Sequence, residues 1–214
     1  MKKKYVLFDL DGTLTDSQEG ILNSIEYMLK HFGIQTPNRD MLRPWLGPPL
    51  TDSLIKYCGF DMEHALEGVA KYREYFDRQG IFENRVYPGM EEFLDRMKGE
   101  GYLLMTATSK PETAARRVLD HFDLTKYFSF IGGATMDDSR VKKGEVIRYV
   151  LESNHLKERS EVMMVGDRMH DIAGAKENGL ESVGVLYGYG GRKELQDAGA
   201  DYLAESVEDI ARFL

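Results

Sequence analysis

Two acidic residues near the start of the chain have the types and spacing that could support chemistry. Asp9 and Asp11 directly follow the apolar run Tyr5–Phe8. Alternation along an extended chain places both carboxylates on one side, where they repel each other unless a cation or a proton intervenes. Asp-Gly pairs are also common in turns. An Asp-x-Asp opening occurs in calcium loops, although Leu14 stands where such a loop needs Gly. The segment indicates either a polar turn or a cation-assisted site.

A second pair of acids follows another apolar run. Asp167 and Asp171 come after Val162–Val165 and are one helical turn apart. Asp171 could simply cap a helix, because Asp side chains accept the free backbone N–H groups of a first turn. Asp167 has no comparable structural role, so we interpret it as the stronger functional candidate.

Hydroxyl and ammonium groups occur at two further boundaries. Thr108 and Ser109 precede a predicted helix, where hydroxyls either cap the helix or donate to an anion beside backbone N–H groups. Lys142 and Lys143 stand where the predicted helix Lys143–Ser153 begins, a position at which positive charge is mildly unfavourable to the helix dipole. A solvated basic cluster is the structural alternative for these lysines, and we expect Lys142 to be solvated.

Hydrophobic periodicity indicates the elements that must position these residues. Five short apolar runs favour strands buried on both faces: Tyr5–Phe8, Tyr102–Thr106, Tyr127–Ile131, Val162–Val165 and Ser182–Leu186. Helical patterns lie between them, at Met90–Lys98, Pro111–His121 and Lys143–Ser153. The alternation predicts an α/β fold with a doubly wound parallel sheet, whose ligands gather at the carboxyl ends of the strands.

One interval breaks this alternation. From Ser17 to about Gln79 the sequence shows only helical patterns, and Val86–Gly89 marks the return to the sheet. We therefore expect a core formed by residues 1–15 and 82–214 with an all-helical domain inserted at residues 16–81. Within that insertion we expect Trp45 to pack among the helices.

The order of these boundaries (acid pair, hydroxyl, lysine, second acid pair) resembles the haloacid dehalogenase superfamily. The matching residues are Asp9-Leu10-Asp11-Gly12-Thr13, Thr108, Lys143, and Gly166-Asp167 through Asp171. The likeness covers essentially the whole chain, and the helical insertion is similar to the cap domain of that superfamily. The resemblance implies a Rossmann-like core and hydrolysis of small phosphate monoesters with Mg²⁺.

The resemblance also implies roles for the acids. Asp9 would attack phosphorus and become an aspartyl phosphate, and Asp11 would protonate the leaving oxygen and then activate water. Magnesium would be bound by Asp9, Asp167 and the backbone carbonyl of Asp11.

Other residues would hold the phosphoryl group and the substrate. Thr108 and Lys143 would contact the phosphoryl oxygens, and Asp171 would orient Lys143 or a metal-bound water. The further candidates for substrate or phosphate binding are Gly12, Thr13, Ser109, Arg43 and Lys56.

Two residues separate reaction classes within the superfamily. The dehalogenases lack the second acid, so Asp11 favours phosphoryl transfer, and Thr13 is more similar to phosphatases than to sugar-phosphate mutases. The segment Arg43–Leu50 resembles the phosphoglycolate phosphatase and 5′-nucleotidase-like branch. A phosphomutase and a non-catalytic phosphate-binding regulatory protein remain the alternatives.

Composition limits the partners. Among 214 residues, 28 Lys and Arg against 36 Asp and Glu give a net charge of −8, which argues against a nucleic-acid polymer as partner. Cys58 is the only cysteine, so no intramolecular disulfide forms. The apolar run after the first lysines is too short for secretion or a membrane span, and we expect a cytoplasmic protein.

We interpret Tyr187–Gly191 as a mobile loop near the site entrance. The sequence does not indicate an oligomeric state.

Overall fold

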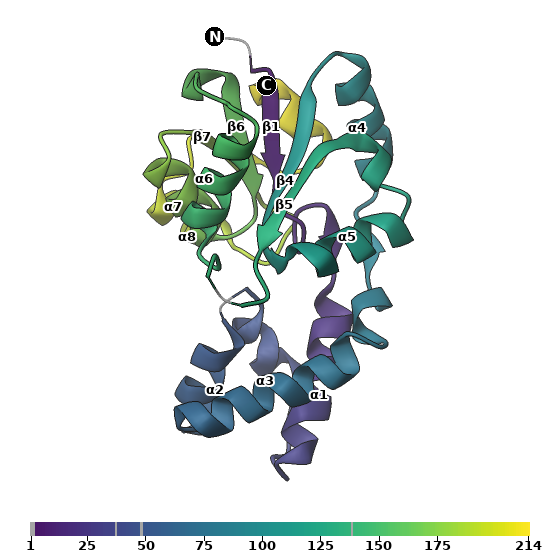
Figure 1. The fold of residues 1–214 in the computed structure, drawn as a ribbon, viewed down its shortest axis with the longest axis vertical. Helices are drawn as coiled ribbons and strands as arrows, with labels where there is room; N and C mark the ends of the chain where they lie inside the picture. Colours follow the sequence, from purple (N-terminus) through teal and green to yellow (C-terminus); the bar gives the residue numbers. More distant parts are fainter. Residues whose placement is uncertain (1–2, 37, 48, 138) are drawn as a thin grey trace. The chain divides into compact units, whose positions relative to one another are not determined.

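The computed structural model describes residues 3–36, 38–47, 49–137 and 139–214, which divide into two compact units (Figure 1). The chain up to Asp16 together with Val86–Leu214 forms the first unit, and Ser17–Arg85 forms the second. The second unit takes in the interval in which the sequence shows only helical patterns.

A six-stranded parallel sheet forms the centre of the first unit. Its strands are β1 (Tyr5–Phe8), β4 (Leu103–Pro111), β5 (Phe128–Ala134), β6 (Val162–Gly166), β7 (Glu181–Val185) and β8 (Tyr202–Ala204), in the order β5-β4-β1-β6-β7-β8. Phe8 lies opposite Thr106 on one neighbour and Val165 on the other. This register brings the carboxyl ends of β1 and β6 nearly level with each other, whereas β4 continues past them to Pro111.

Helices cover both faces of the sheet (Figure 1). Helices α4 (Met90–Gly99) and α5 (Glu112–His121) lie on one face, and α6 (Lys143–Ser153), α7 (Met169–Glu177) and α8 (Arg192–Ala198) lie on the other. Short 3-10 segments are η3 (Thr125–Tyr127), η4 (Arg159–Glu161) and η5 (Glu208–Phe213). From β1 the chain proceeds to β4 and β5 on one side of β1, and then to β6, β7 and β8 on the other side. This reversal creates a switch point beside β1, where ligands bind in open α/β sheets. The predicted doubly wound fold is confirmed.

The core explains why the strands read as continuous apolar runs. On one face Leu7 packs in a buried cluster with Val146, Ile147 and Val150 of α6. On the other face the ring of Phe8 meets the ring of Phe93 edge-on at 6.4 Å. Successive side chains of β1 pack against opposite layers of helices. Every position of the strand, rather than every second one, must therefore be apolar.

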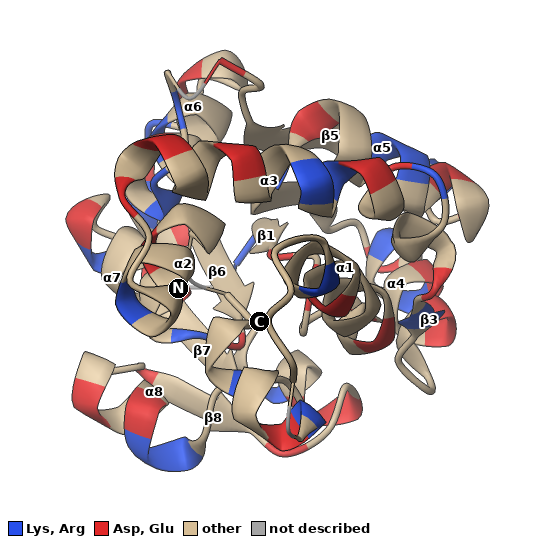
Figure 2. Ribbon diagram, turned by 90° about the horizontal axis from the view of Figure 1, so that it is seen from below, with Lys and Arg blue, Asp and Glu red and all other residues tan. Residues whose placement is uncertain are grey.

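The second unit is built from helices. These are α1 (Gln18–His31), η1 (Arg39–Trp45), α2 (Leu50–Cys58), α3 (Met62–Phe76) and η2 (Gly80–Phe82). The chain segments that connect the units are β2 (Thr15–Asp16) and β3 (Arg85–Val86), which form a two-stranded sheet. Trp45 is buried and stacks on Tyr57, as predicted. Charged residues of both signs line α3 (Figure 2).

The strand β8 and the helix α8 of the first unit were not predicted. Strand β8 has only three residues, of which two are half-buried, and α8 has a single buried residue, Leu195. Elements this short and this exposed carry little hydrophobic periodicity. Among the described residues, no helix is both long enough and apolar enough to cross a membrane.

Shortening Leu7 to alanine tests the packing of the central strand. Because Leu7 is fully buried, Leu7→Ala should lower the free energy of unfolding by about 2–5 kcal/mol in urea denaturation. Leu103 on the neighbouring strand is 46% exposed, so the matched variant Leu103→Ala should change it by less than about 1 kcal/mol. Equal effects at both leucines would contradict the assigned core.

Candidate active site

Three carboxylates converge where strands β1 and β6 end. Asp9 directly follows β1, Asp167 directly follows β6, and Asp171 lies in the first turn of α7. One carboxylate oxygen from each lies within 4.8 Å of the others. All three side chains are buried, Asp167 completely. Adjacent parallel strands thus place residues from distant parts of the sequence in one cluster.

A single buried lysine links two of these acids. The Nζ atom of Lys143, at the first residue of α6, lies 2.7 Å from Oδ1 of Asp9 and 2.8 Å from Oδ1 of Asp171. It also donates a hydrogen bond to the carbonyl oxygen of Ala107 at 2.9 Å. Lys143, rather than the preceding Lys142, therefore enters the cluster.

Asp171 combines the two roles that the sequence left open. Its Oδ2 atom accepts the backbone N–H of Arg168 at 3.0 Å, which caps the start of α7. Its Oδ1 atom pairs with Lys143. The helix cap thereby fixes the carboxylate that orients the lysine.

The cluster carries more negative than positive charge. Three carboxylates and Lys143 would sum to −2 if all were ionised. Burial raises the pKa of Asp9 to about 6, with Lys143 opposing the shift and Asp171 adding to it. Burial, then Asp171 and Asp9, raise the pKa of Asp167 well above its usual value. Burial lowers the pKa of Lys143, but Asp171 and Asp9 outweigh it and the net shift is upward.

The turn after Asp11 packs directly against the Asp167 carboxylate. Gly12 has φ +89°, and its N–H donates to the carbonyl oxygen of Thr15 at 2.7 Å. A Cβ atom at Gly12 would fall 2.3 Å from Oδ2 of Asp167. The buried Thr13 hydroxyl lies 3.4 Å from Oδ1 of the same carboxylate. The Asp-Gly pair is thus both a turn and part of the site.

The glycine-rich segment after β7 is the part of the site that sequence reasoning missed. The backbone N–H of Tyr189 donates to Oδ2 of Asp167 at 2.7 Å, and the Tyr187 hydroxyl donates to the carbonyl oxygen of Thr13 at 3.1 Å. A Cβ atom at Gly188 would lie 2.3 Å from Cβ of Asp167. The segment therefore packs directly on Asp167, whereas its mobility stays a prediction. The signal was the alternation of Tyr and Gly, which permits both close approach and anchoring.

The end of β4 supplies a hydroxyl and a second lysine. Thr108 is buried, and its Oγ1 atom accepts the backbone N–H of Lys110 at 3.2 Å, whereas Ser109 is exposed. Nζ of Lys110 lies 2.6 Å and 2.8 Å from the two carboxylate oxygens of Asp11. Sequence reasoning assigned no role to Lys110.

Comparisons with known proteins identify the family of this chain. A family model for haloacid dehalogenase-like hydrolases matches residues 6–185. The chain belongs to that family. A 5′-nucleotidase from Pseudomonas aeruginosa is 44% identical to this hydrolase over 191 residues, covering 89% of this chain and 86% of that protein. The solved structure of a predicted phosphatase from Clostridium acetobutylicum has a TM-score of 0.95 and 44% identity, and covers 100% of this chain and 98% of that one.

A third relative carries a different name. The tyrosine-protein kinase PtkA from Mycobacterium tuberculosis is 40% identical over 186 residues. The match covers 86% of this hydrolase but only 62% of PtkA.

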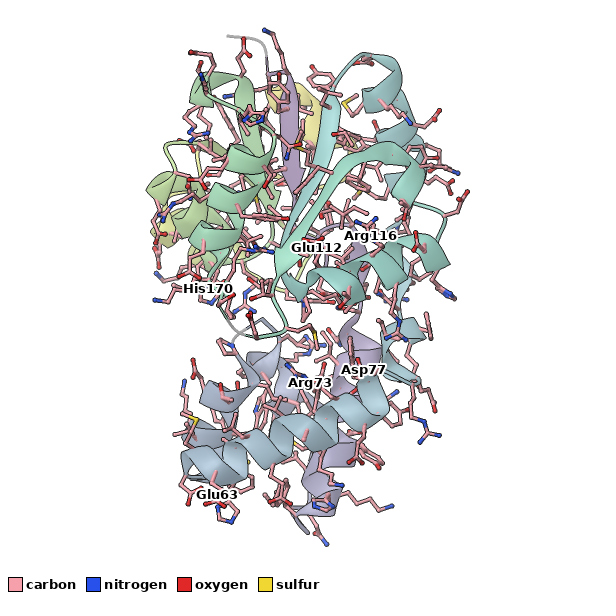
Figure 3. The ribbon with its side chains drawn as sticks, viewed as in Figure 1. Glu63, Arg73, Asp77, Glu112, Arg116 and His170 are labelled. Atoms are coloured by element: carbon pink, nitrogen blue, oxygen red, sulfur yellow. The ribbon has the colours of Figure 1, made fainter. Side chains whose placement is uncertain are left out.

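The remaining predicted residues lie in the second unit or on the surface. Arg43 is exposed and pairs with Asp40 at 3.2 Å, and Nζ of Lys56 lies 4.9 Å from the ring centre of Tyr57. Contact of Arg43 or Lys56 with a substrate stays a prediction. Glu112 and Arg116 extend from α5 (Figure 3), and Arg116 is exposed.

The donor set suits a hard divalent cation. Asp9 and Asp167 offer carboxylate oxygens in a buried cluster. With Lys143 included, the ionised cluster has a net charge of −2. Oxygen ligands and an excess of negative charge are what Mg²⁺ requires of a site. The Asp11 carboxylate pairs with Lys110 and is not one of the three carboxylates of this cluster. The third is that of Asp171.

The pKa of Asp9 predicts how stability depends on pH without divalent cations. Because the folded pKa, about 6, exceeds the ordinary 3.8, this carboxyl costs stability as pH rises from about 4 through 6. In EDTA, raising the pH from 4 to 7.5 should therefore destabilise the wild type through this carboxyl but not Asp9→Asn. The unfolding free energy of Asp9→Asn minus that of the wild type should rise by on the order of 3 kcal/mol over this range. Asp197 is exposed, and Asp197→Asn serves as the control for a carboxylate outside the cluster. A shift in favour of wild type would contradict the assignment.

Filling the space at Gly188 tests the anchoring loop. Gly188→Ala should push against Asp167 and lower the free energy of unfolding by about 1–3 kcal/mol, measured in urea. A Cβ atom at Gly191 would meet no atom of the described residues within 4 Å, so Gly191→Ala should change it by less than about 0.5 kcal/mol. If the two variants are equally stable, the loop does not pack on Asp167 as described.

Proposed function

We propose that this protein is a magnesium-dependent phosphatase that hydrolyses small phosphate monoesters through an aspartyl phosphate. The observation that carries the proposal is the buried cluster of Asp9, Asp167 and Asp171 around Lys143 at the ends of adjacent strands. A carboxylate in such a cluster is a nucleophile that needs only its repulsion with phosphate relieved. The phosphatase and 5′-nucleotidase names of the relatives support the same reaction class.

The proposed reaction has two steps. Oδ of Asp9 attacks phosphorus while the bond to the leaving oxygen breaks, and Asp11 gives that oxygen a proton. Asp11 then takes a proton from water, whose oxygen attacks phosphorus and breaks the bond to Asp9. Thr108 and the ammonium of Lys143 stabilise charge on the phosphoryl oxygens. Ser109, Gly12 and Thr13 are the further candidates for this phosphate site.

Magnesium, when bound by Asp9, Asp167 and the backbone carbonyl of Asp11, would supply the positive charge that lets an anionic substrate approach. Asp171 holds Lys143 toward Asp9, which keeps the ammonium directed at the phosphoryl site. Tyr189 fixes one oxygen of Asp167 through its backbone N–H.

We propose that the helical unit, predicted at residues 16–81, acts as a cap that selects the leaving group. Arg43 and Lys56 are its candidates for gripping a second anionic group of the substrate. Phosphoglycolate-like and nucleoside-monophosphate-like compounds are the proposed substrates. The protein would act in the cytoplasm on a small metabolite, without a nucleic-acid polymer or a membrane as partner.

A phosphate-release assay with and without Mg²⁺ tests this function. Wild-type protein should release phosphate from at least one of a panel of organic acid phosphates, sugar phosphates and nucleotides, and EDTA should abolish release. Asp9→Asn should lower turnover by at least about 10⁴-fold, because no covalent step remains. The surface variant Asp197→Asn should retain wild-type turnover.

Other outcomes would overturn the proposal. Undiminished turnover in Asp9→Asn would exclude Asp9 as the nucleophile. Isomerised or bisphosphorylated product instead of free phosphate would identify a mutase. Phosphate and metal binding without turnover across the panel would identify a binding protein, and transfer of the phosphoryl group to a protein tyrosine would identify a kinase.

A further inference from the structure

Each of the two acids that follow β1 has its own buried lysine. Lys143 pairs with Asp9, and Lys110 pairs with Asp11 through both carboxylate oxygens, at 2.6 and 2.8 Å. The side chain of Lys110 is only 6% exposed. A lysine buried to this extent is costly unless a specific partner compensates it. The pairing with Asp11 is therefore built into the fold and differs from a surface ion pair.

The backbone of β4 is shaped to deliver this lysine. The pairing of β4 with β5 shifts register between Thr108 and Pro111, and such irregularities redirect side chains beside active sites. The Thr108 hydroxyl accepts the N–H of Lys110 at 3.2 Å. At Gly133 of β5 a Cβ atom would lie 2.7 Å from the carbonyl oxygen of Lys110. The Thr108 hydroxyl thus fixes the N–H of Lys110, and the absence of a side chain at Gly133 leaves room for its carbonyl oxygen.

We propose that Lys110 is a positioning residue that fixes the Asp11 carboxylate for its work on the leaving group, an inference that rests on the proposed phosphatase function. Because one ammonium lies within hydrogen-bond distance of both oxygens, the ion pair fixes where the carboxylate lies and which edge of it faces the lysine. A carboxylate has about four lone-pair sites, so Lys110 holds Asp11 at one edge while a free site carries the proton that Asp11 gives to the leaving oxygen and later regains from water. Lys110 keeps its protons in both steps, and no bond to it forms or breaks.

The dependence on the leaving group tests this role. With Lys110→Met, kcat/KM for an alkyl phosphate such as glycerol phosphate should fall by about 10²-fold, because a misplaced acid cannot protonate a poor leaving group. For p-nitrophenyl phosphate, whose leaving group needs little protonation, kcat/KM should fall by less than about fivefold. Lys110→Arg should recover part of the loss, since arginine keeps the positive charge and can donate to both carboxylate oxygens.

A matched control separates positioning from loss of a buried lysine. Lys3 is also buried, donates to the carbonyl oxygen of Ser160 at 2.9 Å and pairs with Glu181, at the amino end of β1. Lys3→Met should leave the ratio of the two kcat/KM values unchanged. In an Asp11→Asn background, Lys110→Met should lower activity by less than about threefold, because the group it positions is already gone.

The wild-type protein in the same assay reports separately on the proposed function. An equal fall in kcat/KM for both substrates with Lys110→Met would overturn the inference while leaving the phosphatase function intact. Urea unfolding of the same variants provides a readout that does not need turnover. Effects of Lys110→Met and Asp11→Asn on unfolding should be non-additive, and additive effects would overturn the inference even if no substrate were turned over.

Discussion

The burial of three carboxylates around one ammonium is the interaction on which the rest of the structure depends. Asp9, Asp167 and Asp171 lie within 4.8 Å of one another with Lys143 against two of them. Such an arrangement costs free energy, as the raised pKa values of Asp9 and Asp167 indicate. A divalent cation would offset that cost, because its charge of +2 would balance the excess negative charge of the cluster. The acidity of the chain is thus compatible with the proposed metal dependence, whereas for a general anion-binding surface it would be an obstacle.

Much of the surrounding structure serves to hold this cluster. The parallel register of β1 and β6 brings Asp9 and Asp167 together. Gly12 and Gly188 let two backbone segments approach the Asp167 carboxylate closer than any side chain would permit. Asp171 caps α7 with one oxygen and orients Lys143 with the other. Structural and chemical roles therefore fall on the same residues, and a substitution at one of them affects both.

Sequence reasoning succeeded where local patterns are strong. The strand at Tyr5–Phe8 and the helix at Lys143–Ser153 match the structure residue for residue, because continuous apolar runs and helical periodicity report burial directly. The proximity of Asp9 to Asp167 followed from parallel strand ends. Pairings that depend on side-chain direction could not be predicted in this way. Lys110 looked like an ordinary residue beside Pro111, and only the irregular end of β4 turns it toward Asp11.

Calorimetric titration of Mg²⁺ into the protein measures cation binding at the acid cluster without requiring a known substrate. We expect one Mg²⁺ bound per wild-type chain and at least about tenfold weaker binding by Asp167→Asn. Absence of binding to the wild type, or equal affinity in Asp167→Asn, would contradict a buried acid cluster that exists to hold a divalent cation.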